Sequence, residues 1–422
     1  MRSSQQRIDS YVSLLRRVLK ESSLCYLGGE TSYFDGKRYV PISLRRSVTP
    51  NAVSLLEDIL QNYGVGATDA RKIGDMPFVV LQNRLYDADD SKVVFDNCVL
   101  DVESGLVLPF GTDIHTSYKM GYSYSSDAKC PMWRKFLNEV LPDVDEQACL
   151  QEFFGMCYLN RKMLSVEKFA IFVGTGRNGK SVVFDVIKSV IGKDKVSNLS
   201  TSQLADDKHV VEVNGKRLNF APDMRKESDF DSALKALSSG QDVAGWRLYS
   251  GSTVVKCPPL VFALNEMPRF RDVTQGFFRR IMLFSFDVTI PEDRQDRSLA
   301  SKIIETESGG VFRWMMEGLW RLQANKGEFT YCQKMASNLE ALKKKVRDEE
   351  SPVLQYLESI GYTICETYFG QEATKVPASA IFHGMGCRLS MNAIARELSS
   401  MNVKRERGTE VRYYLYKKEY GI

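Results

Sequence analysis

The segment Gly174–Ser181 has residue types suited to holding a chain of phosphates. It reads Gly-x4-Gly-Lys-Ser, follows the apolar run Phe169–Val173 and precedes an amphipathic stretch that ends at Gly192. A glycine loop between a strand and a helix directs backbone N–H groups and the helix N-terminus at phosphates. Lys180 would reach the β and γ phosphates, and the Ser181 hydroxyl would hold Mg²⁺. The predicted nucleotide-binding residues are Gly174, Thr175, Gly176, Arg177, Asn178, Gly179, Lys180 and Ser181.

Two polar residues downstream of the loop each follow an apolar segment. Asp223 comes shortly after Arg217–Ala221, and an acid at that place would lie beside Mg²⁺ and position water. Asn265 ends Leu260–Leu264, where an amide contacts a γ-phosphate or the attacking water. A turn cap is the other interpretation of Asn265, because asparagine favours such places.

A pair of arginines opens the next apolar segment. Arg279 and Arg280 precede Ile281–Phe286. The permanent charge and bidentate fork of arginine suit a γ-phosphate contact across a subunit interface. An isolated arginine pair is more often a solvated surface feature.

These chemical groups need a scaffold, and the sequence predicts an α/β one. Strands are expected at Phe169–Val173, Arg217–Ala221, Leu260–Leu264 and Ile281–Phe286, alternating with helices, which favours a mostly parallel sheet. Between the acid and the asparagine, Trp246–Lys256 has the pattern of a hairpin with a Ser-Gly turn. Its residues Arg247, Tyr249 and Lys256 would present charge and a stacking face to a DNA strand.

The flanking regions carry no comparable chemistry. Helical spacing of apolar residues runs through 131–166, and a hairpin with an Asp-Gly turn is expected at Ser32–Pro41 and a second hairpin at Asn97–Pro109. Met1–Lys20 has the pattern of an amphipathic helix, and Met335–Glu350 that of a charged helix.

The C-terminal block is expected to be helices followed by a basic hairpin, as in a winged helix. Tyrosines alternate with cations in the last segment, where a wing would contact duplex phosphates. A solvated edge hairpin is the alternative. The DNA-binding candidates in this segment are Lys404, Arg405 and Arg407.

The bulk composition is that of an ordinary soluble protein of several domains. The net charge is only +4, so nucleic-acid binding would depend on local patches. Nine cysteines without a Cys-x-x-Cys pair and three histidines argue against a zinc site and a disulfide framework. No signal peptide and no run of about 18 apolar residues is present, which predicts a cytoplasmic protein with no membrane partner.

The order of these motifs resembles that of superfamily 3 helicases of the AAA+ type. The greatest likeness is to the phage and plasmid primase-helicase branch, which has poxvirus-type relatives. The resemblance rests on Gly-x4-Gly-Lys-Ser, Lys-Arg-Leu-x4-Asp, Leu-Lys-x-Leu-Ser-x-Gly-x-Asp, Pro-Pro-Leu-x4-Asn-Glu-x-Pro and Arg-Arg-Ile-x-x-Phe-x-Phe, in this order. It covers roughly Asn97 to Phe286.

The resemblance implies roles for individual residues. Lys180 and Ser181 match the nucleotide and Mg²⁺ residues, Asp223 the acid of the second motif, and Asn265 the sensor. Lys235 matches the basic residue of the motif that lies between this acid and the sensor.

Further matches lie at the arginine pair and the hairpin. Arg280 matches the arginine that enters the neighbouring subunit's site, with Arg279 as a possible support. Arg247–Ser250 matches the hairpin that grips single-stranded DNA. This chain departs from some relatives at the hairpin tip, and Met224 stands where many relatives have a second acid, which leaves the general base open.

The resemblance therefore implies a ring-shaped, hexameric, ATP-dependent DNA helicase of a phage, plasmid or mobile element. Its cofactors would be ATP and Mg²⁺. Its partners would be single-stranded and forked DNA, further copies of itself and a separate primase or polymerase. Since no primase signature precedes the motifs, we expect either a stand-alone helicase or the helicase part of a longer primase-helicase. The alternatives are a ring ATPase that recognises or remodels an origin without unwinding, and a small-molecule P-loop kinase.

Four domains are expected along the chain. The expected units are an N-terminal α+β domain at 1–125, a helical collar or oligomerisation region at 126–166, the ATPase core at 167–327 and a winged-helix-like domain at 328–422.

Overall fold

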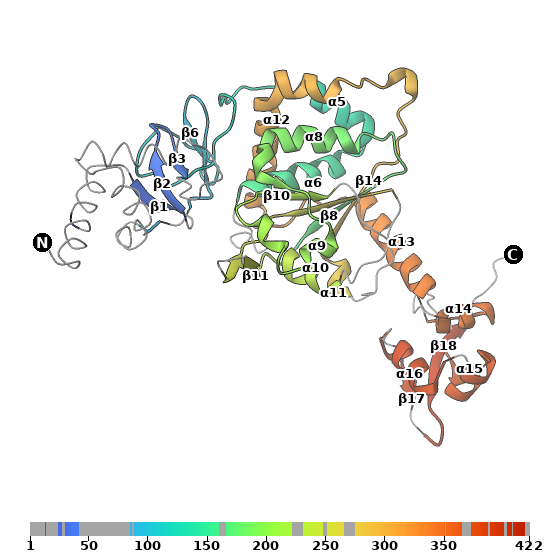
Figure 1. Cartoon of the computed structure of the whole chain (residues 1–422). Helices are drawn as coiled ribbons and strands as arrows, with labels where there is room; N and C mark the ends of the chain where they lie inside the picture. Colours follow the sequence, from blue (N-terminus) through green and yellow to red (C-terminus); the bar gives the residue numbers. More distant parts are fainter. Residues whose placement is uncertain are drawn as a thin grey trace, which may run out of the picture.

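The fold is described from a computed structural model of the chain. The structure describes residues 13, 24–27, 30–41, 85–86, 88–159, 166–221, 231–247, 251–265, 275–350, 352–364, 373–386, 389–400, 403–406 and 408–417. Figure 1 shows small N-terminal sheets, a central body of helices around a sheet, and a C-terminal domain reached through one long helix, α13. The helix expected at Met1–Lys20 lies outside the described residues except for Ser13.

A five-stranded sheet lies at the centre of the molecule. Its strand order is β14-β8-β13-β10-β9, and every neighbouring pair is parallel. The four predicted strands are confirmed, whereas the two-residue edge strand β9 was not predicted. Strands buried on both faces need apolar residues throughout, which explains why these runs stand out in the sequence. The strands are β8 Phe169–Val173, β9 Val196–Ser197, β10 Leu218–Ala221, β13 Leu260–Leu264 and β14 Ile281–Ser285.

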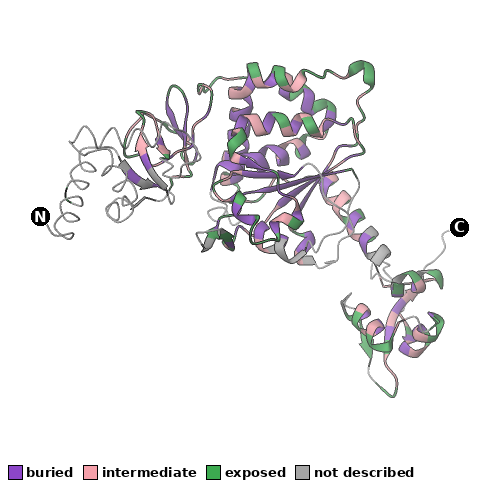
Figure 2. Ribbon diagram, in the orientation of Figure 1, coloured by how far each residue is buried: buried purple, intermediate pink, exposed green. Residues whose placement is uncertain are grey.

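Helices cover both faces of this sheet (Figures 1 and 2). Because side chains alternate along a strand, Ala170 and Phe172 face one hydrophobic core, while Phe169 and Ile171 face a second. The first core is closed by α5 Pro131–Val140, α6 Val144–Gly155, α8 Lys180–Ile191 and α12 Leu299–Ala324. The second is closed by α10 Asp231–Ser238, α11 Gln275–Phe278, α13 Gln333–Glu350 and the 3₁₀ turn η4 Val210–Val213.

Two buried glutamates fix the helical region against α12. Glu307 of α12 accepts hydrogen bonds from the backbone N–H groups of Met132 and Trp133, at 2.9 and 3.0 Å, in the first turn of α5. Glu152 of α6 pairs with Arg321 of α12 at 2.6 Å. A carboxylate at a helix N-terminus satisfies N–H groups that have no partner within the helix. The helical spacing predicted through 131–166 is confirmed over α5 and α6, whose apolar residues lie in the first core.

The N-terminal strands form two small sheets. The hairpin predicted at Ser32–Pro41 is confirmed as β2 and β3, and the one at Asn97–Pro109 as β6 and β7. The second sheet packs on the central body, where the Trp320 indole donates to the Val102 carbonyl at 2.9 Å. The strands are β1 Leu24–Leu27, β2 Glu30–Phe34, β3 Tyr39–Pro41, β4 Leu85–Tyr86, β5 Lys92–Val94, β6 Val99–Asp101 and β7 Val107–Leu108.

The long helix α13 connects the central body to the C-terminal domain. Near its start, Lys334 pairs with the buried Glu146 at 2.8 Å, and Asn338 donates to the Ser285 hydroxyl at 2.9 Å. Glu146 also accepts from the Ser285 backbone N–H at 2.9 Å. These contacts bind α13 to the carboxyl end of β14.

The C-terminal domain has its own core, built from short helices and an antiparallel sheet. The basic hairpin predicted at the end of the C-terminal block is confirmed by the pairing of β17 with β18. The elements are α14 Pro352–Ser359, β15 Tyr362–Thr363, β16 Thr374–Pro377, α15 Ala378–Gly384, α16 Met391–Ser400, β17 Arg405–Glu406 and β18 Arg412–Lys417.

The remaining elements are short or peripheral. They are the 3₁₀ turns η2 Met156–Tyr158, η3 Lys193–Lys195 and η5 Glu292–Arg294, the helix α9 Thr201–Leu204, and the strands β11 Val243–Arg247 and β12 Gly251–Val255. Among the described residues, no helix has the length and hydropathy of a membrane span, and no cluster of His, Cys, Asp and Glu is arranged to hold a metal ion.

Candidate functional site

The glycine loop leaves the carboxyl end of β8, and α8 begins at Lys180. Its backbone enters the left-handed region at Gly176 (φ 109°), Arg177 (φ 53°) and Gly179 (φ 85°). Glycine adopts these angles at little cost, whereas a left-handed arginine is strained. The Arg177 carbonyl accepts from the Ile290 N–H at 2.9 Å, a contact that helps to hold this conformation.

Lys180 is bound inside its own loop. Its ammonium group donates to the Gly174 carbonyl and, at 3.1 Å, to the side-chain oxygen of Asn178. The Asn178 amide in turn donates to the Phe286 carbonyl at 3.2 Å, beyond the end of β14. Burial lowers the pKa of Lys180 from its ordinary value. The loop is therefore held in shape by polar contacts from two strands.

Two glycines in the loop have no space for a side chain. A Cβ atom at Gly174 would lie 2.1 Å from the Asn178 amide nitrogen and 2.5 Å from the Phe286 carbonyl oxygen. A Cβ atom at Gly179 would lie 2.8 Å from carbon atoms of Phe136 and Val140, both on α5. The loop is thus packed directly against α5, which belongs to the helical region before the sheet.

A cavity of about 400 Å³ opens over the loop and the first turn of α8. We call it the loop cavity. The predicted residues Lys180, Ser181 and Asn265 all line it. Asn265 is exposed there, just beyond the carboxyl end of β13. The structure therefore brings the loop and the predicted asparagine together.

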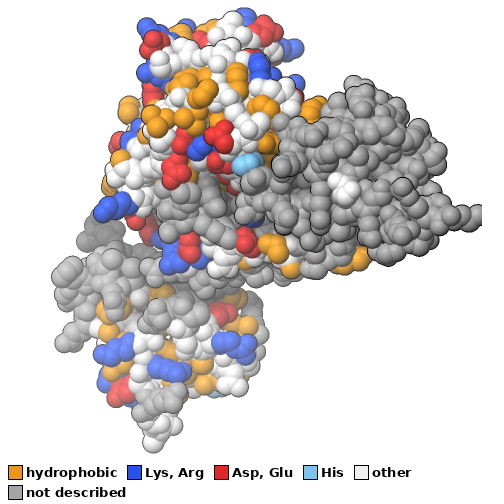
Figure 3. All heavy atoms as spheres, turned by 90° about the vertical axis from the view of Figure 1, so that its left-hand side faces the viewer, with side chains coloured by type: hydrophobic (Ala, Val, Ile, Leu, Met, Phe, Trp, Pro, Cys, Tyr) orange, Lys and Arg blue, Asp and Glu red, His pale blue; other side chains and the backbone are white. Residues whose placement is uncertain are grey.

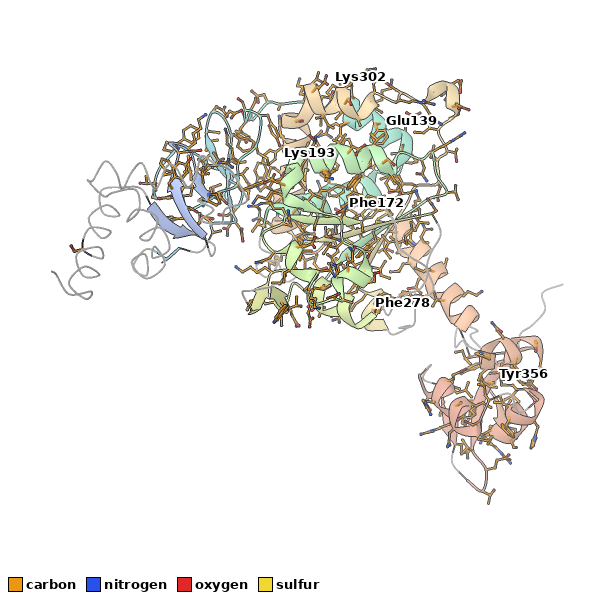
Figure 4. All side chains as sticks on the ribbon, viewed as in Figure 1. Glu139, Phe172, Lys193, Phe278, Lys302 and Tyr356 are labelled. Atoms are coloured by element: carbon orange, nitrogen blue, oxygen red, sulfur yellow. The ribbon has the colours of Figure 1, made fainter. Side chains whose placement is uncertain are left out.

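Sequence reasoning missed the other walls of the loop cavity. One wall comes from α5, which Figure 4 shows carrying Glu139 on the same side of the sheet as Lys302 of α12, whereas Phe278 lies on the other side. The other wall is the segment between β14 and α12. No local pattern marks these residues, because they are brought together only by the fold. The missed lining residues are Phe136, Glu139, Val182, Phe184, Phe220, Ala263, Ile290, Arg294, Gln295, Asp296, Arg297 and Leu299.

The charges around the loop cavity, four cations against the carboxylates of Glu139 and Asp296, suit an anionic ligand. The N-terminus of α8 points its unsatisfied N–H groups and the positive end of its dipole to this side. Arg294 and Arg297 are exposed, and neither guanidinium has a hydrogen-bond or ion-pair partner among the residues that the structure describes. Lys180, a helix N-terminus and two available arginines can together bind a polyphosphate. The apolar side chains of Phe136, Ile290 and Leu299 complete the lining.

The arginine pair lies away from the loop cavity, at the start of β14. Both guanidinium groups contact one carboxylate, Glu167, at 2.8 Å from Arg279 and 2.9 Å from Arg280. Neither arginine lines the loop cavity of its own chain.

Several predicted residues cannot be placed in a site. Asp223, Tyr249 and Arg407 lie outside the described residues. For Lys235 on α10 and Arg247 on β11, only the backbone is described.

The predicted hairpin between the acid and the asparagine is confirmed as β11 and β12, which pair antiparallel. Lys256, directly after β12, is exposed, as are Trp246 and Val254. One side of the hairpin is buried, since a Cβ atom at Gly245 would lie 2.5 Å from Val211.

Cations in the C-terminal domain gather around one tyrosine. The ammonium groups of Lys375 and Lys404 lie 5.4 and 5.2 Å from the centre of the Tyr414 ring. Glu406 pairs with Lys375 at 2.8 Å, which raises the pKa of Lys375 and lowers that of Glu406. Arg405 is exposed beside them. Figure 3 shows Lys and Arg side chains spread over the visible face of this domain.

Comparison with known families gives matches in two parts of the chain. Residues 51–142 match a family described as D5 N terminal like, and residues 172–280 match a family of unknown function (DUF5906). A protein named "Putative helicase L207/L206", from Acanthamoeba polyphaga mimivirus, is 23% identical over 221 residues. The alignment covers 48% of this chain and 22% of that protein, so the chain spans only about a fifth of the relative's length.

Solved structures resemble the fold over most of the chain. Two apo structures of the NrS-1 C-terminal region have TM-scores of 0.53 and 0.52, each with 12% sequence identity. Each comparison covers 95% of this chain and 98% of the solved chain. At this identity the likeness concerns the fold. The two family matches and the mimivirus protein show a likeness of sequence, and the solved structures show a likeness of fold alone.

Proposed function

We propose that this chain is an ATP-dependent DNA helicase that acts in phage or viral DNA replication. The observation that carries the proposal is the loop cavity, in which the glycine loop, Lys180 and Asn265 meet at the carboxyl edge of a parallel sheet. Ligands of open α/β sheets bind at this edge. The match to the D5 N terminal like family and the helicase name of the mimivirus relative support DNA unwinding as the activity.

In this proposal the sheet is an AAA+-like P-loop core and the cavity holds ATP with Mg²⁺. Loop N–H groups and Lys180 would bind the phosphates, as in other glycine loops that open a helix. Ser181 and Asp223 would hold Mg²⁺, and Asn265 would contact the γ-phosphate or the attacking water. Lys235 is the basic residue that the family resemblance adds to this set. The fit rests on the chemistry of the cavity, with its helix N-terminus and cations.

Copies of the chain would assemble into a ring, which we propose to be a hexamer, with each ATP held between two subunits. An arginine from the neighbour would then complete each site. Hydrolysis would move the β11–β12 hairpin, where Arg247, Tyr249 and Lys256 would contact one DNA strand. The C-terminal domain would act as a winged helix, in which Lys404, Arg405 and Arg407 contact duplex phosphates.

The first prediction concerns Lys180→Ala. The loss of the lysine removes charge stabilisation from the transferred phosphoryl group, so we expect ATP hydrolysis to fall by at least about 1000-fold. Strand displacement on a forked duplex should vanish with it. Both are measured on the full chain, with and without single-stranded DNA, and Lys343→Ala on the distant helix α13 is the control. Unchanged hydrolysis in Lys180→Ala would refute the proposed site.

A second candidate function is a ring ATPase that recognises or remodels an origin without unwinding. The cations around Tyr414 favour it, because they form a surface that could hold duplex DNA. DNA-stimulated hydrolysis without strand displacement would select this function. A strictly monomeric protein whose turnover ignores DNA would instead select a small-molecule kinase.

A further inference from the structure

Two carboxylates line the loop cavity, although its other charges suit an anionic ligand. They belong to Glu139 and Asp296, which face the same space as Lys180 and the exposed arginines. A carboxylate beside a bound polyphosphate is repelled by it. Each of these acids must therefore be neutralised by the protein itself or lie beside an uncharged part of the ligand.

Asp296 is neutralised by the protein. Its carboxylate pairs with the Lys302 ammonium group at 2.7 Å. It also accepts from the hydroxyl and the backbone N–H of Ser298, at 2.6 and 2.9 Å. Because Ser298 directly precedes α12, these contacts order the start of that helix. The role of Asp296 is therefore structural.

Glu139 has no comparable partner. It is exposed in the last turn of α5, and its carboxylate has no hydrogen bond or ion pair with any residue that the structure describes. The C-terminal end of a helix carries the negative end of its dipole, so a carboxylate there gains nothing from its own helix. The stability of α5 thus gives no reason for an acid at this position.

The last turn of α5 lies against the point where the glycine loop enters α8. A Cβ atom at Gly179 would lie 2.8 Å from carbon atoms of Phe136 and Val140. Glu139 follows Phe136 by three residues, a spacing that puts both on one face of the helix. Both side chains line the loop cavity. Glu139 is therefore within the proposed nucleotide site, close to the loop.

The order of the strands determines which end of a nucleotide lies near α5. Asn265, the proposed contact of the γ-phosphate, follows β13, which lies on one side of β8, whereas β14 lies on the other. The segment after β14 reaches the loop, since Ile290 N–H donates to the Arg177 carbonyl at 2.9 Å. The start of α6 is on this side as well, because Glu146 accepts from Ser285 N–H at the end of β14. A nucleotide with its γ-phosphate at Asn265 therefore has its nucleoside on the β14 side, beside the α5–α6 turn.

The nucleoside is the uncharged part of a nucleotide, and its ribose carries two neighbouring hydroxyl groups. An ionised carboxylate only accepts hydrogen bonds, and its two oxygens can accept one from each hydroxyl. An acidic side chain binds a ribose hydroxyl in the same way in dinucleotide-binding folds. The apolar side chains of Ile290 and Leu299 line the cavity too and suit the flat face of a base.

We infer that Glu139 accepts hydrogen bonds from the ribose hydroxyls of the nucleotide in the loop cavity and selects ribonucleotides over deoxyribonucleotides. The inference rests on the proposed function, since it requires a nucleoside triphosphate in this cavity. It gives α5, which precedes the sheet in the chain, a direct part in choosing the substrate. The selection keeps deoxynucleoside triphosphates, which a DNA polymerase consumes, out of the ATPase site.

The first experiment measures kcat/KM for ATP, 2′-deoxy-ATP and 2′,3′-dideoxy-ATP with the full chain. Hydrogen bonds to a charged group contribute about tenfold or more, so we expect the wild type to prefer ATP over the dideoxy nucleotide by about 30-fold. In Glu139→Ala this ratio should fall to about threefold or less, mainly through the KM for ATP. Glu139→Gln should give an intermediate ratio, because its amide oxygen still accepts one hydrogen bond.

The second experiment measures binding without turnover. Inorganic tripolyphosphate has the phosphate charge of the nucleotide and no sugar. Because Glu139→Ala removes a repelling charge, it should bind tripolyphosphate about two- to threefold more tightly and a non-hydrolysable ATP analogue about tenfold more weakly. The melting temperature should stay at the wild-type value, since Glu139 has no described partner to lose. Opposite changes for the two ligands cannot come from general damage to the cavity.

Glu292→Ala is the matched control. Glu292 is an exposed acid in η5, two residues before Arg294, and it does not line the loop cavity. Its loss removes the same charge from the same region of the protein. The preference for ATP over the dideoxy nucleotide should therefore keep its wild-type value in this variant.

Three results would overturn the inference. One is a sugar preference that is absent in the wild type or unchanged in Glu139→Ala. Another is an equal fall in kcat for all three nucleotides, which would place Glu139 in phosphoryl transfer. The third is a changed preference between ATP and inosine triphosphate with no change in sugar preference, which would make Glu139 a contact of the base.

Lys180→Ala separates this inference from the proposed function. If Lys180→Ala binds tripolyphosphate and the ATP analogue as the wild type does, the proposed nucleotide site itself has failed. If Lys180→Ala loses both ligands while Glu139→Ala keeps the wild-type sugar preference, the site stands and only the role of Glu139 is wrong.

Discussion

The loop cavity and the β17–β18 hairpin both gather cations, but they hold them in different ways. In the loop cavity, Lys180 is fixed by a carbonyl and an amide, and the chain around it is too tight for a side chain at Gly174. Beside the hairpin, Lys375 of β16 and Lys404 lie over the ring of Tyr414 on an exposed surface. The first arrangement can define the position of a few ligand atoms, and the second can accept many positions of a charged backbone.

This difference has an energetic side. In a tight, partly buried site, the displacement of one group leaves its polar partners without a hydrogen bond, because no water can take its place. One substitution there can therefore disrupt the whole site. Exposed cations act nearly independently, and salt screens each of them. Single substitutions should therefore have large effects at the loop cavity and small, salt-dependent effects at the hairpin.

Among substitutions that keep Lys180, the largest effect is expected from Gly174→Ala. The added Cβ atom would lie 2.1 Å from the Asn178 amide nitrogen and 2.5 Å from the Phe286 carbonyl, so the loop must shift. A displacement of about 1 Å at a catalytic centre can cost 100-fold, and we expect at least that loss in kcat/KM for ATP. Gly121→Ala is the control, since no atom lies within 4 Å of its added Cβ. Equal activity of the two variants would contradict the view that the loop is held rigidly.

An intermediate effect is expected from Lys334→Ala, which leaves the buried Glu146 without its cation. Loss of one partner of a fully buried pair costs about 3 to 5 kcal/mol, and since Lys334 is 30% exposed we expect about 2 kcal/mol in the free energy of unfolding. Lys343→Ala, on the same helix, removes an ion pair with the exposed Glu340 and should cost less than about 0.5 kcal/mol. Urea denaturation of both variants measures the difference.

The pH dependence of Lys334→Ala provides a second readout. Burial raises the pKa of Glu146 above its ordinary 4.5, and Lys334 opposes the shift, so the variant should raise that pKa further. Where the folded state binds more protons than the unfolded state, stability falls as pH rises. The loss in free energy of unfolding, relative to the wild type, should therefore be greatest above the folded-state pKa of Glu146. It should shrink as pH falls through that pKa. A deficit that is the same on both sides of that pKa would show that the carboxylate charge is not its cause.

The smallest effect is expected from Lys404→Ala at the hairpin. Its loss should weaken duplex DNA binding several-fold at low salt and reduce the slope of log affinity against log salt by about 1. The ATPase rate without DNA should stay at the wild-type value. Fluorescence anisotropy over a range of salt concentrations measures the slope. A loss of 100-fold with no change in salt slope would mean that the hairpin positions its ligand as tightly as the loop cavity does.

The sequence predicts the parts of the molecule that depend on local patterns. Phe169–Val173 and Leu260–Leu264 are uniformly apolar because both faces of the sheet are covered, and this marks them as buried strands. The glycine loop is visible because Gly176 and Gly179 have left-handed backbone angles that favour glycine. The place of Asn265 at the end of a strand follows from the same pattern.

Other features depend on contacts between distant segments. Glu139 precedes the glycine loop in the sequence and Arg294 follows it, yet both line the loop cavity. Neither residue belongs to a recognisable sequence motif. Glu146 has the sequence signature of a surface helix residue, yet it is buried between α13 and β14. The difference in side-chain exposure between Arg279, at 62%, and Arg280, at 13%, is also beyond the sequence, since the two residues share one motif and differ only in what packs around them.

The anchoring of α13 has a mechanical consequence. The helix has 18 residues and is therefore about 27 Å long, but its described polar ties to the central body, at Lys334 and Asn338, are near its first end. Farther along, Leu342 and Val346 pack in the second core, so the helix moves with the sheet as one body. A tilt of about 10° about the ties then moves the far end of the helix by about 4 Å. Because the ties reach Ser285 at the end of β14, small strains in the sheet become displacements of the C-terminal domain. The helix is in this sense a lever arm.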